Sequence, residues 1–167
     1  MAGSASRTRG GRWDCGRVSA EGDIPPSLLS FAELWLAELG LGGKKCLLKP
    51  DGEALPRPFS GSMRLYREDG TCLELDTVAK PLPPEHRYVR EVRAGRYDLI
   101  AISIGEWCLR EGADGPCPRC APAHHTLLQH TVLHELVHVA FPEYSAHNEW
   151  TDNKVRELLE RASSFFP

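Results

Sequence analysis

Two histidines and a glutamate in the C-terminal part of the chain have the spacing of a metal site. Residues 134–138 read His-Glu-Leu-Val-His, the pattern H-E-x-x-H. On an α-helix, residues four apart lie on the same face, so His134 and His138 can bind one cation between them. The surrounding residues are largely apolar, which predicts a buried helix whose ionisable side chains need partners. The alternative is a hydrogen-bonded histidine pair on a core helix, with Glu135 at the surface.

A catalytic zinc ion usually takes three protein ligands and leaves a fourth position to water. His147 is the first candidate for the third ligand, because it lies nine residues after His138 at the start of the next predicted helix. Glu149 is the second candidate. Asp152, Glu143 and a site without a third protein ligand are the remaining alternatives.

These ligands indicate a hydrolytic reaction. Zinc lowers the pKa of its bound water towards about 7 and polarises a carbonyl, so Glu135 can accept the water proton and later pass it to the leaving amine. Tyr144 is either a donor to transition-state charge or a packing residue at the surface, and we expect the latter. An extended peptide substrate can pair with a sheet edge near the site, and we predict strand 97–104 as that edge.

Another histidine, His130, lies one turn before His134 on the same predicted face. It could shape the pocket or polarise a substrate, but we expect a solvent-facing or hydrogen-bonded side chain.

A loop rich in Gly, Pro and Cys at 108–125 precedes the motif helix and contains a C-x-x-C pair. One interpretation is a second, structural zinc ion in a Cys₃His site. A redox or disulfide pair and plain free thiols are the other two. The candidate ligands are Cys108, Cys117, Cys120 and His124, with His125 as the alternative to His124.

Length and composition restrict the class of protein. A chain of 167 residues with 41% hydrophobic residues fits one domain with its own core. The net charge of −3 argues against a dedicated nucleic-acid-binding protein. No stretch approaches the roughly 18–20 apolar residues that span a bilayer, so we expect no membrane partner. Residues 1–22 read as a flexible, weakly basic arm without the apolar segment of a secretory signal. We therefore expect an intracellular protein, cytoplasmic or nuclear, with reduced cysteines.

Apolar periodicity and turn residues predict the elements that must position the motif. They are a helix over about 28–39 between Pro26 and Gly40, a hairpin of strands 63–66 and 72–75 around Asp69-Gly70, strands at 88–92 and 97–104, a helix over 126–140 ended by Pro142, and a helix over 146–162 with Ser145 as N-cap. This order predicts a small α+β domain over 23–167, with a short mixed sheet packed on the motif helix.

With H-E-L-V-H on one helix, then His147 opening the next helix and Trp150 close behind, the chain resembles the WLM, SprT-like and minigluzincin group of small zincin metallopeptidases. The resemblance covers about 27–162 in element order, and its specific motif spans 134–150. It implies His134, His138 and His147 as zinc ligands and Glu135 as the catalytic acid/base.

The resemblance also implies a class of substrate, because WLM and SprT-like proteins are associated with cleaving proteins crosslinked to DNA. The expected partner is thus a protein or peptide, with DNA as an expectation carried by the family. The features that bear on DNA are the weakly basic N-terminal arm and the arginines of one segment. A solvated strand face explains these arginines at least as well: Arg87, Arg90, Arg93 and Arg96.

Two rival interpretations remain. Peptide deformylases also use H-E-x-x-H, with a cysteine as third ligand, and residues 106–109 (Glu-Trp-Cys-Leu) weakly resemble their cysteine motif. In that case Cys108 would be a ligand of an amide hydrolase. The other rival is a non-catalytic, zinc-stabilised interaction module in which both metal ions are structural.

Overall fold

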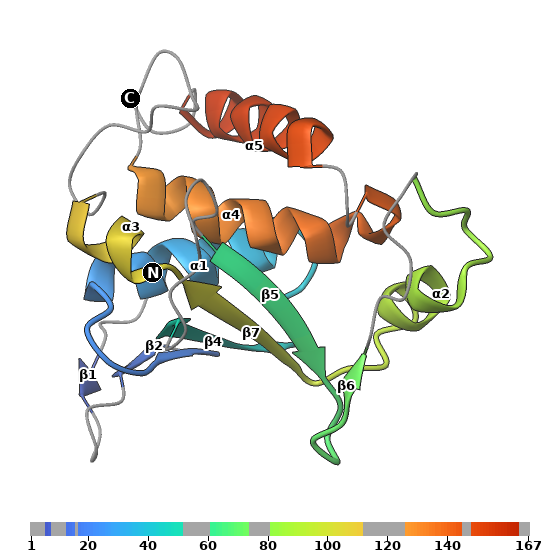
Figure 1. Ribbon diagram of the computed structural model, residues 1–167, viewed down its shortest axis with the longest axis horizontal. Coiled ribbons are helices and arrows are strands. Elements are labelled where there is room, and N and C mark those ends of the chain that lie inside the picture. The colour runs from blue at the N-terminus through green and yellow to red at the C-terminus, as the bar shows by residue number, and fades with distance from the viewer. Residues whose placement is uncertain are drawn as a thin grey trace.

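The fold is α+β, as predicted. The computed structural model describes residues 6–7, 13–15, 17–51, 61–73, 81–111, 126–144 and 148–163. Figure 1 shows one sheet with helices α1 and α4 packed on it, and helix α5 lying over α4 on the side away from the sheet. In chain order the elements are β1 (Ser6–Arg7), β2 (Trp13–Cys15), β3 (Val18–Ala20), α1 (Pro26–Glu38), β4 (Lys45–Pro50), β5 (Gly61–Tyr66), β6 (Cys72–Leu73), α2 (Arg87–Arg93), β7 (Leu99–Ile104), α3 (Glu106–Glu111), α4 (Leu127–Ala140), the 3₁₀ helix η1 (Pro142–Tyr144) and α5 (Asn148–Ser163).

Within the described residues, the strands form one mixed sheet in the order β1-β2-β3-β4-β7-β5-β6. Strands β3, β4 and β7 run parallel, and β5 is antiparallel to β7. Because β7 has a neighbour on each side, the prediction that strand 97–104 is the sheet edge is wrong. Its sequence, Leu-Ile-Ala-Ile-Ser-Ile, explains the difference. A strand with a neighbour on each edge and most of its side chains buried reads as a near-continuous apolar run, and four of the six residues of β7 are buried.

The segment 1–22, where we expected a flexible arm, contains strands β1, β2 and β3. In β3, Val18 pairs with Cys46 of β4 and Ala20 pairs with Leu48, and Val18 and Ala20 are fully buried. Strands of two or three residues are too short for a periodic signal, so composition dominates the prediction there. The parallel pair needs a crossover connection, and α1 supplies it. Strand β4 has no counterpart among the predicted elements.

Helix α1 begins and ends where proline and glycine predict. Pro26 is its first residue, a position where the missing backbone N–H removes no helical hydrogen bond. Past the other end, Gly40 has a positive φ of 75°. The N–H of Gly40 donates to the Ala37 carbonyl at 3.1 Å, and that of Leu41 donates to the Leu36 carbonyl at 2.7 Å. This pair of bonds is a Schellman motif, which satisfies the last carbonyls of the helix.

The predicted hairpin is present, with β5 and β6 antiparallel around a turn. Gly70 there has a φ of 87°, which glycine adopts without steric cost. The segment 88–92 is different: it belongs to helix α2, and the predicted strand is wrong. The buried residues of α2 follow helical spacing and are Tyr88, Val89 and Val92.

Helix α4 carries the H-E-x-x-H motif as predicted, and its first turn is fixed by a capping box. The Thr126 hydroxyl accepts from the Gln129 backbone N–H at 3.1 Å. The Gln129 side-chain oxygen accepts in return from the Thr126 N–H at 2.9 Å. The helix ends at Ala140, and Pro142 then opens η1, because proline cannot continue the helical hydrogen bonds.

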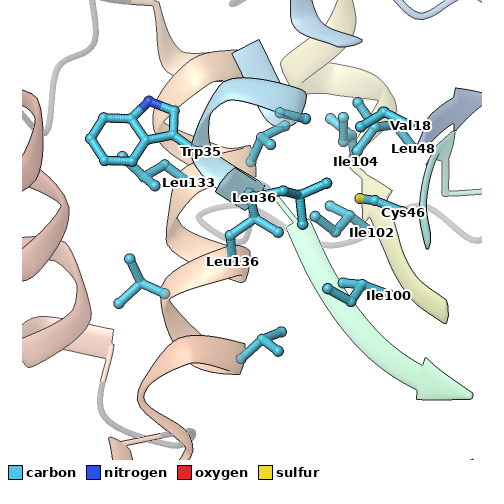
Figure 2. Close-up of a cluster of buried hydrophobic side chains, with 14 of the residues drawn as sticks. Val18, Trp35, Leu36, Cys46, Leu48, Ile100, Ile102, Ile104, Leu133 and Leu136 are labelled. Carbon is cyan, nitrogen blue, oxygen red and sulfur yellow. The ribbon is translucent and has the colours of Figure 1, made fainter. Parts of the chain in front are cut away.

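The apolar side of α4 lies against α1 and the sheet, as Figure 2 shows. Each large aliphatic side chain buried there contributes about 1.5–3 kcal/mol to stability. This packing fixes α4 on the sheet and leaves its opposite side to α5. The residues at this contact include Trp35, Leu36, Ile100, Ile102, Leu133 and Leu136.

Helix α5 packs on the remaining side of α4, and its residues Thr151 and Val155 are both fully buried. It covers nearly the whole of the predicted helix 146–162, whereas its predicted N-cap, Ser145, lies outside the described residues. No helix among the described residues is long and apolar enough to cross a membrane.

Strand β5 approaches α4 so closely that its first residue must lack a side chain. A Cβ added to Gly61 would lie 2.7 Å from Thr131 Cγ2 and 3.1 Å from the Ser103 carbonyl oxygen. The Thr131 side chain cannot easily move away, because its hydroxyl donates to the Leu127 carbonyl at 2.8 Å.

We predict that Gly61→Ala destabilises the protein by about 1–3 kcal/mol through this overlap. Urea unfolding measures the effect. The matched control is Gly43→Ala, where the added Cβ meets nothing within 4 Å. Combining Gly61→Ala with Thr131→Ser, which removes the methyl group and keeps the hydroxyl, should restore part of the loss. Equal stabilities of Gly61→Ala and Gly43→Ala would contradict the close approach.

Candidate metal centre

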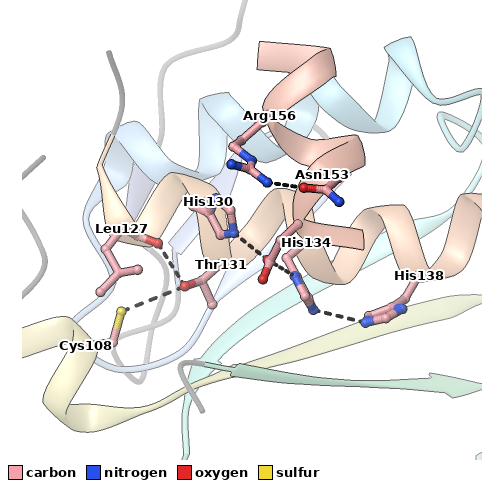
Figure 3. A network of polar contacts seen from close by, with 9 residues as sticks. Cys108, Leu127, His130, Thr131, His134, His138, Asn153 and Arg156 are labelled. Carbon is pink, nitrogen blue, oxygen red and sulfur yellow. Dashed lines mark hydrogen bonds and ion pairs between the residues drawn. The ribbon is translucent and has the colours of Figure 1, made fainter. Parts of the chain in front are cut away.

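Three histidines form a row along the side of α4 that faces α5 (Figure 3). His130, His134 and His138 follow one another at intervals of four residues, so each lies about one turn from the next. All three are buried, with exposed fractions of 0%, 8% and 6%. A buried imidazole needs polar partners: His130 and His134 contact Asp152 of α5, and His138 contacts His134.

Asp152 of α5 binds two of these histidines through one carboxylate oxygen. Its Oδ1 lies 2.8 Å from His130 Nε2 and 2.8 Å from His134 Nδ1. Burial opposes ionisation of this carboxyl, but the hydrogen bonds and positive charge of both histidines hold the pKa of Asp152 well below its usual range. An ionised carboxylate only accepts hydrogen bonds, so both facing nitrogens carry protons.

The other nitrogen of His134 points at His138. The two Nε2 atoms are 3.0 Å apart, and the rings meet edge-on at 81°. Because the Nδ1 of His134 carries the proton, its Nε2 holds a lone pair when the ring is neutral. The two histidines of the motif therefore converge through the nitrogens that a shared cation would need.

Glu135 is buried beside this pair, with 7% of its surface exposed, and is not at the surface as the alternative interpretation requires. Burial raises the pKa of its carboxyl to about 7; the charge of His134 lowers it and that of Asp152 raises it further. The Cγ of Glu135 lies 3.8 Å from the position of a Cβ on Gly61, so the carboxyl stem runs next to the start of β5.

Among the described residues, one group of metal-ligating side chains comes together: His130, His134 and Asp152, with one donor atom of each within 4.8 Å of the others. This group could hold a metal ion. Imidazole nitrogen and carboxylate oxygen suit zinc and related divalent ions. His134 has two possible roles here, because its Nδ1 faces this group and its Nε2 faces His138.

Of the other third-ligand candidates, Glu149 is exposed on the first turn of α5. The carboxylate of Glu143 forms an ion pair with Arg93. Cys108, the ligand in the deformylase interpretation, is fully buried with its Sγ 3.9 Å from Thr131 Oγ1. The remaining predicted ligands lie outside the described residues: Cys117, Cys120, His124, His125 and His147.

Tyr144 packs against an aromatic side chain, as expected. Its ring stacks on Trp150 with centroids 3.8 Å apart and an angle of 6° between the planes. Phe141 meets the same indole edge-on at 5.5 Å. These contacts join η1 to the first turns of α5, on either side of the segment 145–147.

The arginines considered for DNA divide into two kinds. Arg93 is paired with Glu143 and Arg96 with Glu91. Arg87 and Arg90 are exposed on helix α2, not on the strand face that we predicted.

Sequence reasoning considered Asp152 only as a direct ligand and missed its contact with His130. The signal available was the repeated spacing of four from His130 to His138, which places all three histidines on one side of a helix. The partner on α5 could not be identified from that spacing, because it depends on how α5 lies on α4.

No family model, curated protein or solved structure matches this chain.

We predict that Glu135 makes the metal-free protein less stable as the pH rises. Its pKa is about 7 when folded, against 4.5 for the free side chain, so the folded state binds the proton more tightly. The stability that this proton contributes is complete below pH 4.5 and is lost as the pH passes 7. The glutamine of Glu135→Gln cannot ionise. Relative to the wild type, the free energy of unfolding of this variant should therefore rise by up to about 3 kcal/mol above pH 8.

Urea unfolding between pH 5 and 8.5, with a chelator present, measures this difference. Glu68→Gln on the exposed hairpin turn is the control and should follow the wild-type curve. If the Glu135→Gln curve also runs parallel to the wild type at all pH values, the carboxyl is not held in the protonated form.

Proposed function

We propose that this protein is a zinc-dependent metallopeptidase that hydrolyses peptide bonds with Glu135 as general base and acid. The observation that carries the proposal is the convergence of His134 Nε2 and His138 Nε2 at 3.0 Å, in an H-E-x-x-H helix that buries the intervening glutamate. A purely structural zinc site does not require a buried carboxyl beside its ligands.

The donor set suits zinc bound through the Nε2 atoms of His134 and His138. Metal-bound histidines usually donate their other ring N–H to a carboxylate or carbonyl, which fixes the ring and raises its basicity. Asp152 accepts such a bond from His134 Nδ1. His147 is proposed as the third ligand and Glu149 as the alternative, which leaves one position for water or substrate.

When bound, zinc would polarise the peptide carbonyl and acidify a water molecule. Glu135 supplies the proton transfers. A carboxyl with a pKa of about 7 can both take up and release a proton near neutral pH, which matches a group that accepts the water proton and returns it to the leaving amine. The positive charge of a bound metal ion would favour the ionised form that begins the reaction.

The substrate we propose is an extended peptide or an unfolded protein segment. Residues 61–64 of β5 pair with β7 on one edge, while β6 pairs only with Leu65 and Tyr66 on the other. Among the described strands, the outer edge of 61–64 is thus open for an added strand. This edge starts beside Glu135, so it replaces strand 97–104 as the proposed substrate edge.

The decisive experiment combines metal analysis with hydrolysis of an unfolded protein. Glu135→Gln should retain zinc and lose at least about 10²-fold in activity, because the proton acceptor is gone while the ligands remain. His138→Ala should lose both zinc and activity. Glu68→Gln makes the same substitution at an exposed position away from the site, and its zinc content and activity should match the wild type. Unchanged cleavage by Glu135→Gln would refute the mechanism, and zinc without any hydrolysis in the wild type would favour a zinc-stabilised interaction module.

The third ligand has its own test. We predict that His147→Ala lowers zinc stoichiometry or affinity strongly, whereas Glu149→Ala leaves both close to the wild type. Removing one of three protein ligands exposes the ion to competing water, so a chelator should extract it from His147→Ala much faster. The reverse result would assign Glu149 as the ligand.

The same metal analysis tests the proposed structural zinc ion, because it measures the number of zinc ions per chain. Two zinc ions per chain, falling to one in Cys117→Ser, would support the Cys₃His site. One ion per chain in the wild type would remove it.

A further inference from the structure

His130 is the most deeply buried of the three histidines, and the proposed peptidase mechanism does not use it. Its side chain is fully enclosed, whereas that of Asp152 is 28% exposed. The Nε2 atom of His130 donates to the same Oδ1 that accepts from His134 Nδ1. The peptidase mechanism gives no reason for this contact between the buried His130 and Asp152, the carboxylate that binds the proposed zinc ligand His134.

We propose that His130 is a positioning residue that acts through Asp152 to hold His134 with its Nε2 turned towards His138 and the metal ion. The inference rests on the proposed zinc site at His134 and His138. In this arrangement the contacts among His130, His134 and Asp152 orient the zinc ligand His134. The three side chains do not bind the metal ion together.

His130 and His134 together fix the position of the Asp152 carboxylate. Two N–H donors at 2.8 Å bind one oxygen of Asp152 from neighbouring turns of α4. A carboxylate held by one donor can rotate and take water at its exposed side, but two convergent donors fix the position of the oxygen. His130 thus determines where Oδ1 lies when it meets His134.

The Asp152 carboxylate also determines which ring nitrogen of His134 carries the proton. The carboxylate accepts the Nδ1 proton, so the neutral ring keeps its lone pair on Nε2, opposite His138. Direct metal binding by the His130, His134 and Asp152 group would instead require both protons facing Asp152 to leave. It would also turn the lone pair of His134 away from His138. The hydrogen-bonded arrangement needs neither change.

The test measures the ring nitrogens of His134 and the affinity for zinc in ¹⁵N-labelled protein. Long-range proton–nitrogen NMR spectra should show the Nδ1–H form of His134 without metal and coordination through Nε2 with zinc. In His130→Phe the metal-free ring should become a mixture of the two neutral forms. Zinc affinity, measured by competition with a chelator, should fall about tenfold.

Two further variants separate positioning from stability. His130→Gln places an amide N–H near the position of Nε2 and should restore affinity to within about threefold of the wild type. Leu128→Ala removes a buried side chain from the same helix and should lower stability while leaving the His134 spectrum and zinc affinity unchanged.

Three outcomes would overturn the proposal: zinc coordination through His134 Nδ1 together with His130, unchanged affinity and spectrum in His130→Phe, or equal losses in His130→Phe and His130→Gln. Its failure is distinguishable from that of the peptidase function. If zinc binds as proposed and no peptide is cleaved, the peptidase function fails and the positioning role stands. If no zinc binds, the ring form of His134 in metal-free His130→Phe still decides whether His130 positions it.

Discussion

The bifurcated contact of Asp152 with His130 and His134 is the constraint on which the arrangement of α4 and α5 depends. An ionised carboxylate and two imidazoles between packed helices are costly unless each polar atom finds a partner. Both 2.8 Å contacts converge on one oxygen, so a shift of α5 along α4 by even part of a turn would break them. The contact therefore sets the register of two helices as well as the orientation of a ring. Thr151 and Val155, buried next to it, add the apolar packing that the polar contact alone would lack.

Helix α4 has two sides with different roles: one packs in the core and the other carries the histidines. Leu133 and Leu136 pack towards α1 and the sheet, and this apolar contact holds the helix in place. The opposite side presents its row of histidines to α5. A buried helix can carry ionisable residues where another element supplies partners, and for His130 and His134 that element is the helix that follows in the chain. The stacking of Tyr144 on Trp150 fixes the first turns of α5 against η1 and so limits how far α5 can move from the site.

Residue spacing and turn residues in the sequence correctly predicted the elements that depend on neighbouring residues alone. The spacing of four residues in the motif, the Asp69-Gly70 turn and Pro142 correctly indicated α4, the hairpin and the helix end. Predictions failed where pairing partners decide the outcome. The run at 88–92 is compatible with strand or helix, and packing of its buried side chains selects the helix. The place of β7 inside the sheet depends on two strands distant in sequence. The same limit applies to the site: the convergence of His134 and His138 follows from helical spacing, whereas the partnership with Asp152 follows from the packing of α5.

The environment of Glu135 connects the sheet to the chemistry proposed for the site. Burial raises the pKa of this carboxyl to about 7, and β5 passes directly beside it. That approach is possible because Gly61 has no side chain to meet Thr131. A bulkier residue would push β5 outwards, admit water around the carboxyl and return its pKa towards the ordinary range. The same displacement would move the open edge of β5 away from the glutamate. One glycine thus couples the proton affinity of the proposed base to the position of the proposed substrate strand.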